Sequence, residues 1–170
     1  MFRLKPCPPD FVDSAPAHFD NQAVVCGTPE QVFDVVTAIE HEGAWFPDFK
    51  QAHWTAGPPG PGATRDYRLT YLRLIEHFAI WQRGKHLAFW VSGASLPLVT
   101  RFVEDYRFTP TADGRTHLRW RVAYQPSFFL RPLHPMLRPL FARDFRRATA
   151  NLVAYCRRLY GPGASAGLDS

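Results

Sequence analysis

Polar and apolar residues alternate along the chain between residues 64 and 125, with the two-residue period of a β-strand that buries one face. Tyr67, Leu69 and Tyr71 share the apolar side of one predicted strand. On the last strand, apolar residues face one way and polar residues the other: Leu118, Trp120, Val122 and Tyr124 against His117, Arg119 and Arg121. This pattern predicts an antiparallel sheet with one buried and one solvent-exposed face.

Two hairpins are predicted. The first has strands at 75–82 and 87–92 joined by a turn at 83–86, and the second has strands at 101–110 and 116–125 joined by a turn at 111–115. The first turn would pair Ile80 with Phe89 and Phe78 with Val91. The inward side of 75–82 stays open, because this strand is apolar on both faces. Shorter strands are expected at 18–26 and 51–55, and the Gly- and Pro-rich segment 57–62 is a loop.

Helical periodicity flanks the predicted sheet. Thr28 as N-cap, Pro29 in the first turn and Gln31 as capping-box partner begin a helix whose buried face is Val32, Phe33, Val36 and Ile39. Gly43 interrupts this pattern, and Trp45-Phe46-Pro47 indicates a second short helical turn that ends at the proline.

A long amphipathic helix is predicted near the end of the chain. Its apolar stripe has a spacing of three to four residues: Leu137, Phe141, Phe145, Ala148, Leu152, Tyr155 and Leu159. Pro139 suits the first turn of this helix or kinks a longer one. Residues 18–160 would form one domain, with an irregular proline-rich arm at 1–17 and a flexible tail at 161–170.

Composition adds two features to this picture. The chain has 14 Phe, 5 Trp and 6 Tyr, and a formal charge of +5. Between residues 131 and 160 there are seven Arg and one Asp, so the positive excess belongs to the last helix. Such a segment suits a solvated helix face, with transient attraction to a membrane surface during lipid loading as a minor hypothesis. Nucleic acid is not expected as a partner, because the basic and aromatic faces of this helix are opposite each other.

Cysteine usage and the first residues bear on location. Three widely spaced cysteines form no C-x-x-C motif, and the first residues lack the apolar core of a signal peptide. The sequence therefore predicts a cytoplasmic protein without a disulfide framework, and leaves its oligomeric state open.

The order of elements, with the stretches Thr28–Val36, Trp45–Pro47, Glu104–Pro110, Asp113-Gly114 and Thr116–Val122, resembles the SRPBCC or START-like (helix-grip) superfamily, which includes polyketide cyclase/dehydrase-like and lipid-transfer proteins. The resemblance spans about residues 18–160. It implies an α+β fold in which a curved seven-stranded antiparallel sheet wraps around the C-terminal helix, with two short helices after the first strand. It also implies a cavity for an apolar small molecule and transfers no catalytic residue.

Thirteen aromatic residues are candidate walls of this cavity: Trp45, Phe46, Tyr67, Tyr71, Phe78, Phe89, Phe102, Tyr106, Phe108, Trp120, Tyr124, Phe141 and Phe145. The alternative is that they fill a solid core. The Tyr and Trp residues favour a cavity, because their polar tips need partners or water when they are buried.

Glu104 is the candidate catalytic residue. It shares a strand face with Phe102 and Tyr106, which places a carboxylate on the inner side, where it would act as general acid or base or bind a ligand hydroxyl. The alternatives are a structural ion pair with an Arg and exposure of Glu104 at a strand edge. Glu76 is a weaker candidate of the same kind. Its neighbour His77 points to the opposite face, so the two do not form a dyad.

Two functions remain open from the sequence. One is a module that binds a lipid, sterol or polyketide-like molecule, and the other is a polyketide cyclase, aromatase or dehydratase that uses Glu104 with Tyr67, Tyr71 or Tyr106. No metal-ligand spacing and no phosphate-binding glycine motif occurs, so neither metal nor cofactor is expected. Asp144 and Asn151 border the apolar helix stripe and either reach the cavity or make contacts on the helix flank.

Overall fold

The computed structural model describes residues 1–162, which form a single antiparallel sheet and three α-helices. The strands are β1 (Phe2–Arg3), β2 (Ala17–Val25), β3 (Phe49–Ala56), β4 (Thr64–Leu69), β5 (Arg73–Gln82), β6 (His86–Ala94), β7 (Val99–Pro110) and β8 (Thr116–Pro126). Seven of them follow the order β2-β8-β7-β6-β5-β4-β3, and β1 pairs with β6. The helices are α1 (Pro29–Thr37), α2 (Ile39–Trp45) and α3 (His134–Tyr160), with a 3-10 helix, η1, at Pro9–Asp13.

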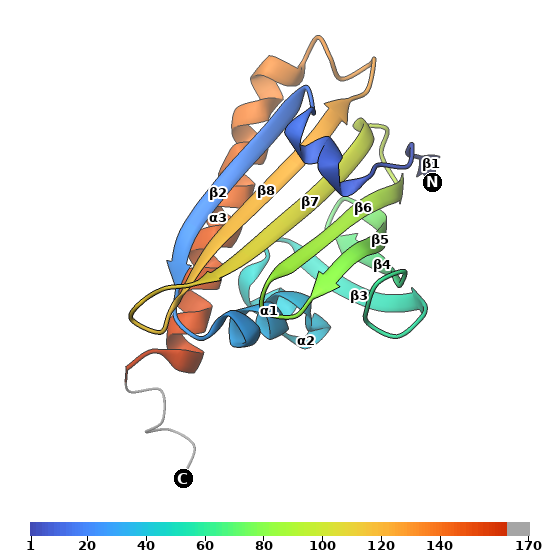
Figure 1. The fold of residues 1–170 in the computed structure, drawn as a ribbon. Helices are drawn as coiled ribbons and strands as arrows, with labels where there is room; N and C mark the ends of the chain where they lie inside the picture. The colour runs from blue at the N-terminus through green and yellow to red at the C-terminus, as the bar shows by residue number, and fades with distance from the viewer. Residues whose placement is uncertain (163–170) are drawn as a thin grey trace.

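The sheet curves around α3, as Figure 1 shows, and α1 and α2 close one end of the layer between them. Antiparallel neighbours along the whole sheet and helices gathered on one face confirm the α+β helix-grip fold expected from the sequence. The main core occupies this layer and includes Val32, Phe33, Trp120 and Leu152.

The first helix begins as predicted, and the second does not. Thr28 accepts a hydrogen bond from the Gln31 amide, and the Gln31 side chain accepts one from the Thr28 amide. Ala38 is extended and separates α1 from α2, so Ile39 begins the second helix instead of ending the first. Gly43 lies inside α2 and does not interrupt it. The change of direction at Ala38 lets α2 bury Glu42 and Trp45.

Pro139 lies inside α3, so the longer of the two predicted helices forms. The buried stripe differs at its end from the expected one. Cys156 is fully buried, whereas Leu159 is 38% exposed. The stripe follows Ala148, Leu152 and Cys156, because four-residue steps keep these side chains over the sheet.

The first hairpin forms in a different register from the one predicted. Phe78 pairs with Phe89 and Ile80 with Ala88, with an irregularity between the two pairs. The turn has three residues instead of four, and Gly84 adopts a positive φ of 71° in it. The bulge lets Phe78 and Trp81 both reach the inner face, with their ring centroids 5.2 Å apart. The second hairpin pairs Pro110 with Thr116 and confirms the predicted turn.

The N-terminal arm is more ordered than the sequence suggested, because it contains β1 and η1. Phe11 and Val12 of η1 are buried against Val103 and Ala123 on the face of the sheet that points away from α3. Part of the face predicted to be solvent-exposed is therefore covered. Of the expected tail, 163–170 lie outside the described residues.

Candidate functional site

A cavity of about 370 Å³ lies between the inner face of the sheet, α2 and α3. Its walls are mostly aliphatic and aromatic, with polar groups from Glu42, Arg65, Glu76 and Glu104. The exposed members of its lining mark the mouth: Asp48, Tyr71, Leu96 and Asp144. A volume of this size matches the lower end of the range for sites that bind small organic ligands.

Most of the aromatic residues selected from the sequence are brought together at this cavity. The residues that line it are Trp45, Phe46, Tyr67, Tyr71, Phe78, Phe89, Phe102, Tyr106, Tyr124, Phe141 and Phe145. Phe108 and Trp120 lie behind the wall instead. Phe108 packs on Phe33 with ring centroids 5.4 Å apart, and Trp120 stacks on Tyr106 at 5.1 Å. These two belong to the packed core that supports the cavity.

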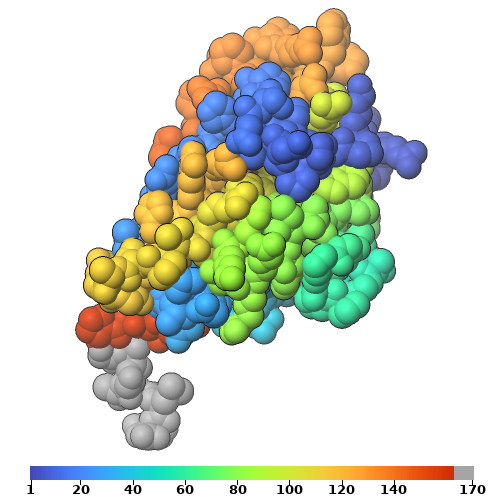
Figure 2. Space-filling view, in the orientation of Figure 1, coloured from blue at the N-terminus to red at the C-terminus, as the bar shows by residue number. Residues whose placement is uncertain are grey.

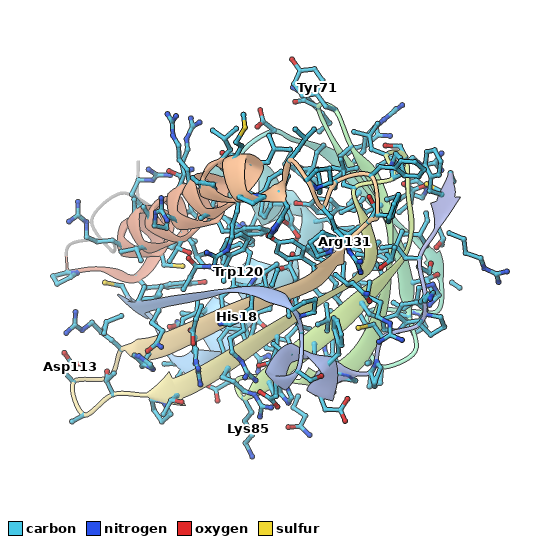
Figure 3. The ribbon with its side chains drawn as sticks, turned by 90° about the horizontal axis from the view of Figure 1, so that it is seen from above. His18, Tyr71, Lys85, Asp113, Trp120 and Arg131 are labelled. Carbon is cyan, nitrogen blue, oxygen red and sulfur yellow. The ribbon has the colours of Figure 1, made fainter. Side chains whose placement is uncertain are left out.

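Tyr71 occupies a different position from the one predicted. Strand β4 ends at Leu69, so Tyr71 lies in the loop before β5 and is 84% exposed. Figure 3 shows it projecting from the molecule at the rim, whereas Trp120 lies on the side of β8 that faces α3. The alternation of Tyr67, Leu69 and Tyr71 suggested a longer strand, but the turn between β4 and β5 begins at Thr70.

A buried ionic cluster forms one part of the cavity wall. The Arg65 guanidinium donates to Glu76 through Nε (2.7 Å) and to Glu42 through Nη1 (2.9 Å), and the Tyr67 hydroxyl donates to Glu42 (3.0 Å). Sequence reasoning found Tyr67 and Glu76 but missed Glu42 and Arg65. Arg65 precedes Tyr67 by two residues and therefore shares its inward face, a signal that was available in the sequence.

Burial dominates the electrostatics of this cluster. It raises the pKa of Glu42 to about 7, although Arg65 opposes the shift. It also raises the pKa of Glu76, again against the effect of Arg65. Burial favours the neutral form of Arg65, but the Glu76 and Glu42 carboxylates outweigh it and raise the pKa of the guanidinium. Arg65 therefore stays charged, while the Glu42 carboxyl group titrates near neutral pH.

Glu104 lies on the inner face of β7, as the strand pattern predicted. Its Oε2 accepts hydrogen bonds from the Tyr106 hydroxyl (2.7 Å) and from Trp120 Nε1 (2.8 Å). The salt bridges of the described residues include none with Glu104, so the alternative of an ion pair with an Arg is wrong. Burial raises its pKa to about 8 although both hydrogen bonds oppose the shift, so Glu104 is mostly protonated at neutral pH.

The remaining polar candidates have clear positions. Asp144 lies in the cavity lining at its mouth, whereas the Asn151 side chain donates to the Trp45 carbonyl oxygen (3.1 Å) on the helix flank. His77 points away from the cavity, where it stacks on Trp90 and bonds to Ser92. Among the described residues, the indole Nε1 of Trp45 is buried without a hydrogen-bond partner. Trp45 also lines the cavity.

Residues 1–162 contain no group of three or more His, Cys, Asp and Glu side chains arranged to hold a metal ion. None of the helices described there is both long and apolar enough to cross a lipid bilayer.

A sheet curved around a long C-terminal helix, with a largely apolar cavity between them, defines the helix-grip class of α+β domains. The chain belongs to the family described as polyketide cyclase / dehydrase and lipid transport, whose model matches residues 16–157. An uncharacterised protein of Mycobacterium tuberculosis is 31% identical over 147 residues, which cover 85% of this chain and 87% of the relative.

Solved structures support the fold. The Zhui aromatase/cyclase from Streptomyces sp. R1128 superposes with a TM-score of 0.72 at 12% identity and covers 87% of this chain and 97% of its own. Ara h 8.0201 gives a TM-score of 0.66 at 12% identity, with coverage of 82% and 97%. A protein of Thermus thermophilus gives 0.68 at 13% identity, with the same coverage. At these identities the likeness extends to the fold alone.

Proposed function

We propose that this protein binds a hydrophobic or aromatic small molecule, such as a lipid, sterol or polyketide-like compound, in the cavity between the sheet and α3. The observation that carries the proposal is a cavity of about 370 Å³ whose apolar walls surround a few buried hydrogen-bonding groups. Apolar surface supplies affinity for such a ligand, and the polar groups fix its orientation. Protonated Glu104 is a hydrogen-bond donor for a carbonyl or hydroxyl oxygen of the ligand.

Native mass spectrometry of the freshly purified protein tests this proposal, with a mass increment from a co-purified apolar compound as the expected result. Filling the cavity provides the matched experiment. Ala94 lines the cavity and is buried, so Ala94→Phe places a ring inside it. Ala112 lies in an exposed turn, so Ala112→Phe adds the same ring to the surface.

We expect Ala94→Phe to lose the bound compound and Ala112→Phe to retain it. Circular dichroism and thermal unfolding must show that both variants are folded. Retention of the compound by a folded Ala94→Phe protein, or the absence of binding to the parent protein across a panel of lipids, sterols and aromatic polyketides, would contradict the proposal.

Enzymatic dehydration is the second candidate function, and the environment of Glu104 favours it. A buried carboxylic acid with a pKa of about 8 keeps its proton at neutral pH and can give it to a departing hydroxyl oxygen, which leaves as water. A base takes a proton from the neighbouring carbon, and a carbon–carbon double bond forms. An ionised carboxylate beside Arg65 is the base that the cavity offers.

Glu104→Gln separates the two functions. The amide keeps an oxygen that accepts from Tyr106 and Trp120 but carries no acidic proton. If the parent protein converts a hydroxylated polyketide and Glu104→Gln binds it without conversion, the enzymatic function is supported. If both proteins bind the ligand and neither converts it, the protein is a binding module.

A further inference from the structure

Five large apolar side chains are exposed together where β8 leads into α3. They are Phe128, Phe129, Leu133, Met136 and Leu140, and we call this set the apolar tip. Phe128, Phe129 and Met136 are 77%, 79% and 75% exposed. Figure 2 shows the segment that carries them, in orange, at one end of the molecule. Large apolar side chains gathered on a surface mark a site of interaction.

The base of the apolar tip is fixed to the body of the protein. Leu130 is buried, and the Ser127 amide donates to the Leu98 carbonyl oxygen in the loop between β6 and β7 (3.0 Å). The Tyr124 hydroxyl and His134 Nε2 are 2.8 Å apart at the start of α3. These contacts hold Phe128 and Phe129 outward, with their rings packed on each other at 5.9 Å.

Arginines predominate among the charges around the apolar tip; Asp144, one turn beyond Leu140 on α3, and Asp20, near Arg138, are acidic side chains next to it. The sequence contains no Asp or Glu between Asp113 and Asp144, whereas Arg131 and Arg138 lie within the tip segment. Further along α3, Arg143 and Arg147 follow Met136 and Leu140 at steps of three and four residues. They therefore continue the same exposed stripe of the helix.

We propose that the apolar tip docks on the surface of an anionic lipid bilayer. Phe128 and Phe129 insert at the boundary between headgroups and acyl chains, and the arginines contact lipid phosphates. Arg143 lies about 10 Å beyond Met136 along the helix at about 1.5 Å per residue, and interfacial segments insert by about 5–10 Å. The guanidinium therefore reaches the headgroup level when Met136 is inserted.

Charge complementarity favours an anionic bilayer over a second copy of the chain as the surface that the apolar tip contacts. Two apolar tips brought face to face would oppose Arg131, Arg138 and Arg143 with the same residues, and these like charges would repel each other. An anionic bilayer offers both an apolar layer and a layer of negative charge, in the same order as the tip and its arginines.

The apolar tip is next to the cavity mouth. Leu140 of the tip is followed by Phe141, which lines the cavity, and the loop that binds Ser127 contributes Leu96 and Leu98 to the lining. Docking would place the mouth near the headgroups. The docking itself does not depend on what the cavity holds, so its test and that of the proposed function fail separately.

Vesicle co-sedimentation of the full chain tests the proposal, with vesicles of phosphatidylcholine and phosphatidylglycerol in equal amounts and vesicles of phosphatidylcholine alone. The variant is Phe128→Ser/Phe129→Ser, and its control is Leu159→Ser, which removes an exposed apolar side chain at the other end of α3. A second pair compares Arg143→Gln/Arg147→Gln with Arg157→Gln. All these positions are exposed, so the variants keep the fold, which circular dichroism verifies.

We expect the parent protein to bind the anionic vesicles, and binding to fall as salt screens the arginines. The double Phe variant should bind at least about tenfold more weakly, and the double Arg variant about 30-fold more weakly. Both control variants should bind nearly as the parent does.

Three outcomes would overturn the proposal. The first is no binding of the parent to anionic vesicles at low salt, and the second is equal binding of the double Phe variant and Leu159→Ser. The third is that the parent does not bind vesicles but forms a concentration-dependent dimer in light scattering, and that the double Phe variant does not form this dimer. This result would assign the apolar tip to contact with a second copy of the chain.

Discussion

At the residue scale, Arg65 controls the charge of the cavity. Among the described residues that line it, Arg65 is the one basic side chain, and the same lining contains three buried glutamates. It makes hydrogen bonds to Glu42 and Glu76 but none to Glu104. Removing one partner of a buried ion pair leaves an uncompensated charge, which is more costly than replacing the whole cluster with neutral groups.

Arg65→Met should therefore destabilise the protein by about 3–5 kcal/mol at about pH 8, as for other broken buried pairs. The loss should be smaller at about pH 5, because both glutamates then take up protons and no buried charge remains. Urea unfolding at the two pH values measures the difference. The control is Arg65→Met/Glu42→Gln/Glu76→Gln, which should recover stability at the higher pH. An equal loss at both pH values would show that Arg65 contributes through packing alone.

Glu104 makes a second prediction about pH. Because its pKa rises from 4.5 to about 8 on folding, the folded protein holds a proton that the unfolded chain releases. Stability must then fall as the pH rises between these two values. Glu104→Gln carries no such proton, so its loss of stability over this range should be smaller by roughly 2–4 kcal/mol. Chemical unfolding at a series of pH values checks this, and parallel profiles for both proteins would argue against a protonated Glu104.

At the element scale, alternation and capping predicted the sheet and α1, because each signal depends on neighbours close in sequence. Thr28 and Gln31 cap α1, and Leu118 to Tyr124 alternate as expected. The bulge opposite Phe89, the end of β4 before Tyr71 and the burial of Arg65 depend on contacts between distant segments. The same difference between local and long-range signals explains which buried glutamate was predicted. Glu104 was found from its strand face, whereas Glu42 enters the cavity through a turn at Ala38 that the sequence did not indicate.

The N-terminal arm gives a prediction about one element. Phe11 of η1 is buried against β7 and β8, with the Arg101 guanidinium 5.4 Å from its ring centroid. Phe11→Ala should cost about 2–4 kcal/mol of stability, whereas Phe2→Ala, at an exposed position, should cost much less. Thermal unfolding compares the two variants. Both should keep the parent's ligand affinity, since η1 lies on the face opposite the cavity; a weaker affinity in Phe11→Ala would show that the arm supports the site.

At the scale of the whole molecule, the charge of +5 conceals two regions of opposite sign. The exposed side of α3 and the apolar tip are rich in arginine. The cavity lining contains Glu42, Glu76, Glu104, Asp48 and Asp144 against Arg65 alone among its described residues. A surface that attracts anions therefore adjoins a cavity that disfavours them. An anionic lipid suits the outer surface of this protein, and a neutral or cationic molecule suits its interior.

This separation predicts how ligand charge affects binding. Dodecylamine, dodecanol and dodecanoate share one chain and differ in their polar group. A carboxylate in the cavity meets the ionised carboxylates beside Arg65 and the exposed Asp48 and Asp144 at the mouth, and like charges held close together in an interface cost several kcal/mol. Dodecanoate should therefore bind at least about tenfold more weakly than the alcohol or the amine at neutral pH. Isothermal titration calorimetry measures the three affinities, and Ala94→Phe, which fills the cavity, identifies binding outside it. The gap should narrow near pH 5, because dodecanoate and the glutamates then become neutral. Tighter binding of dodecanoate would overturn the prediction and leave ligand binding itself intact; failure of all three compounds would count against an alkyl-chain ligand.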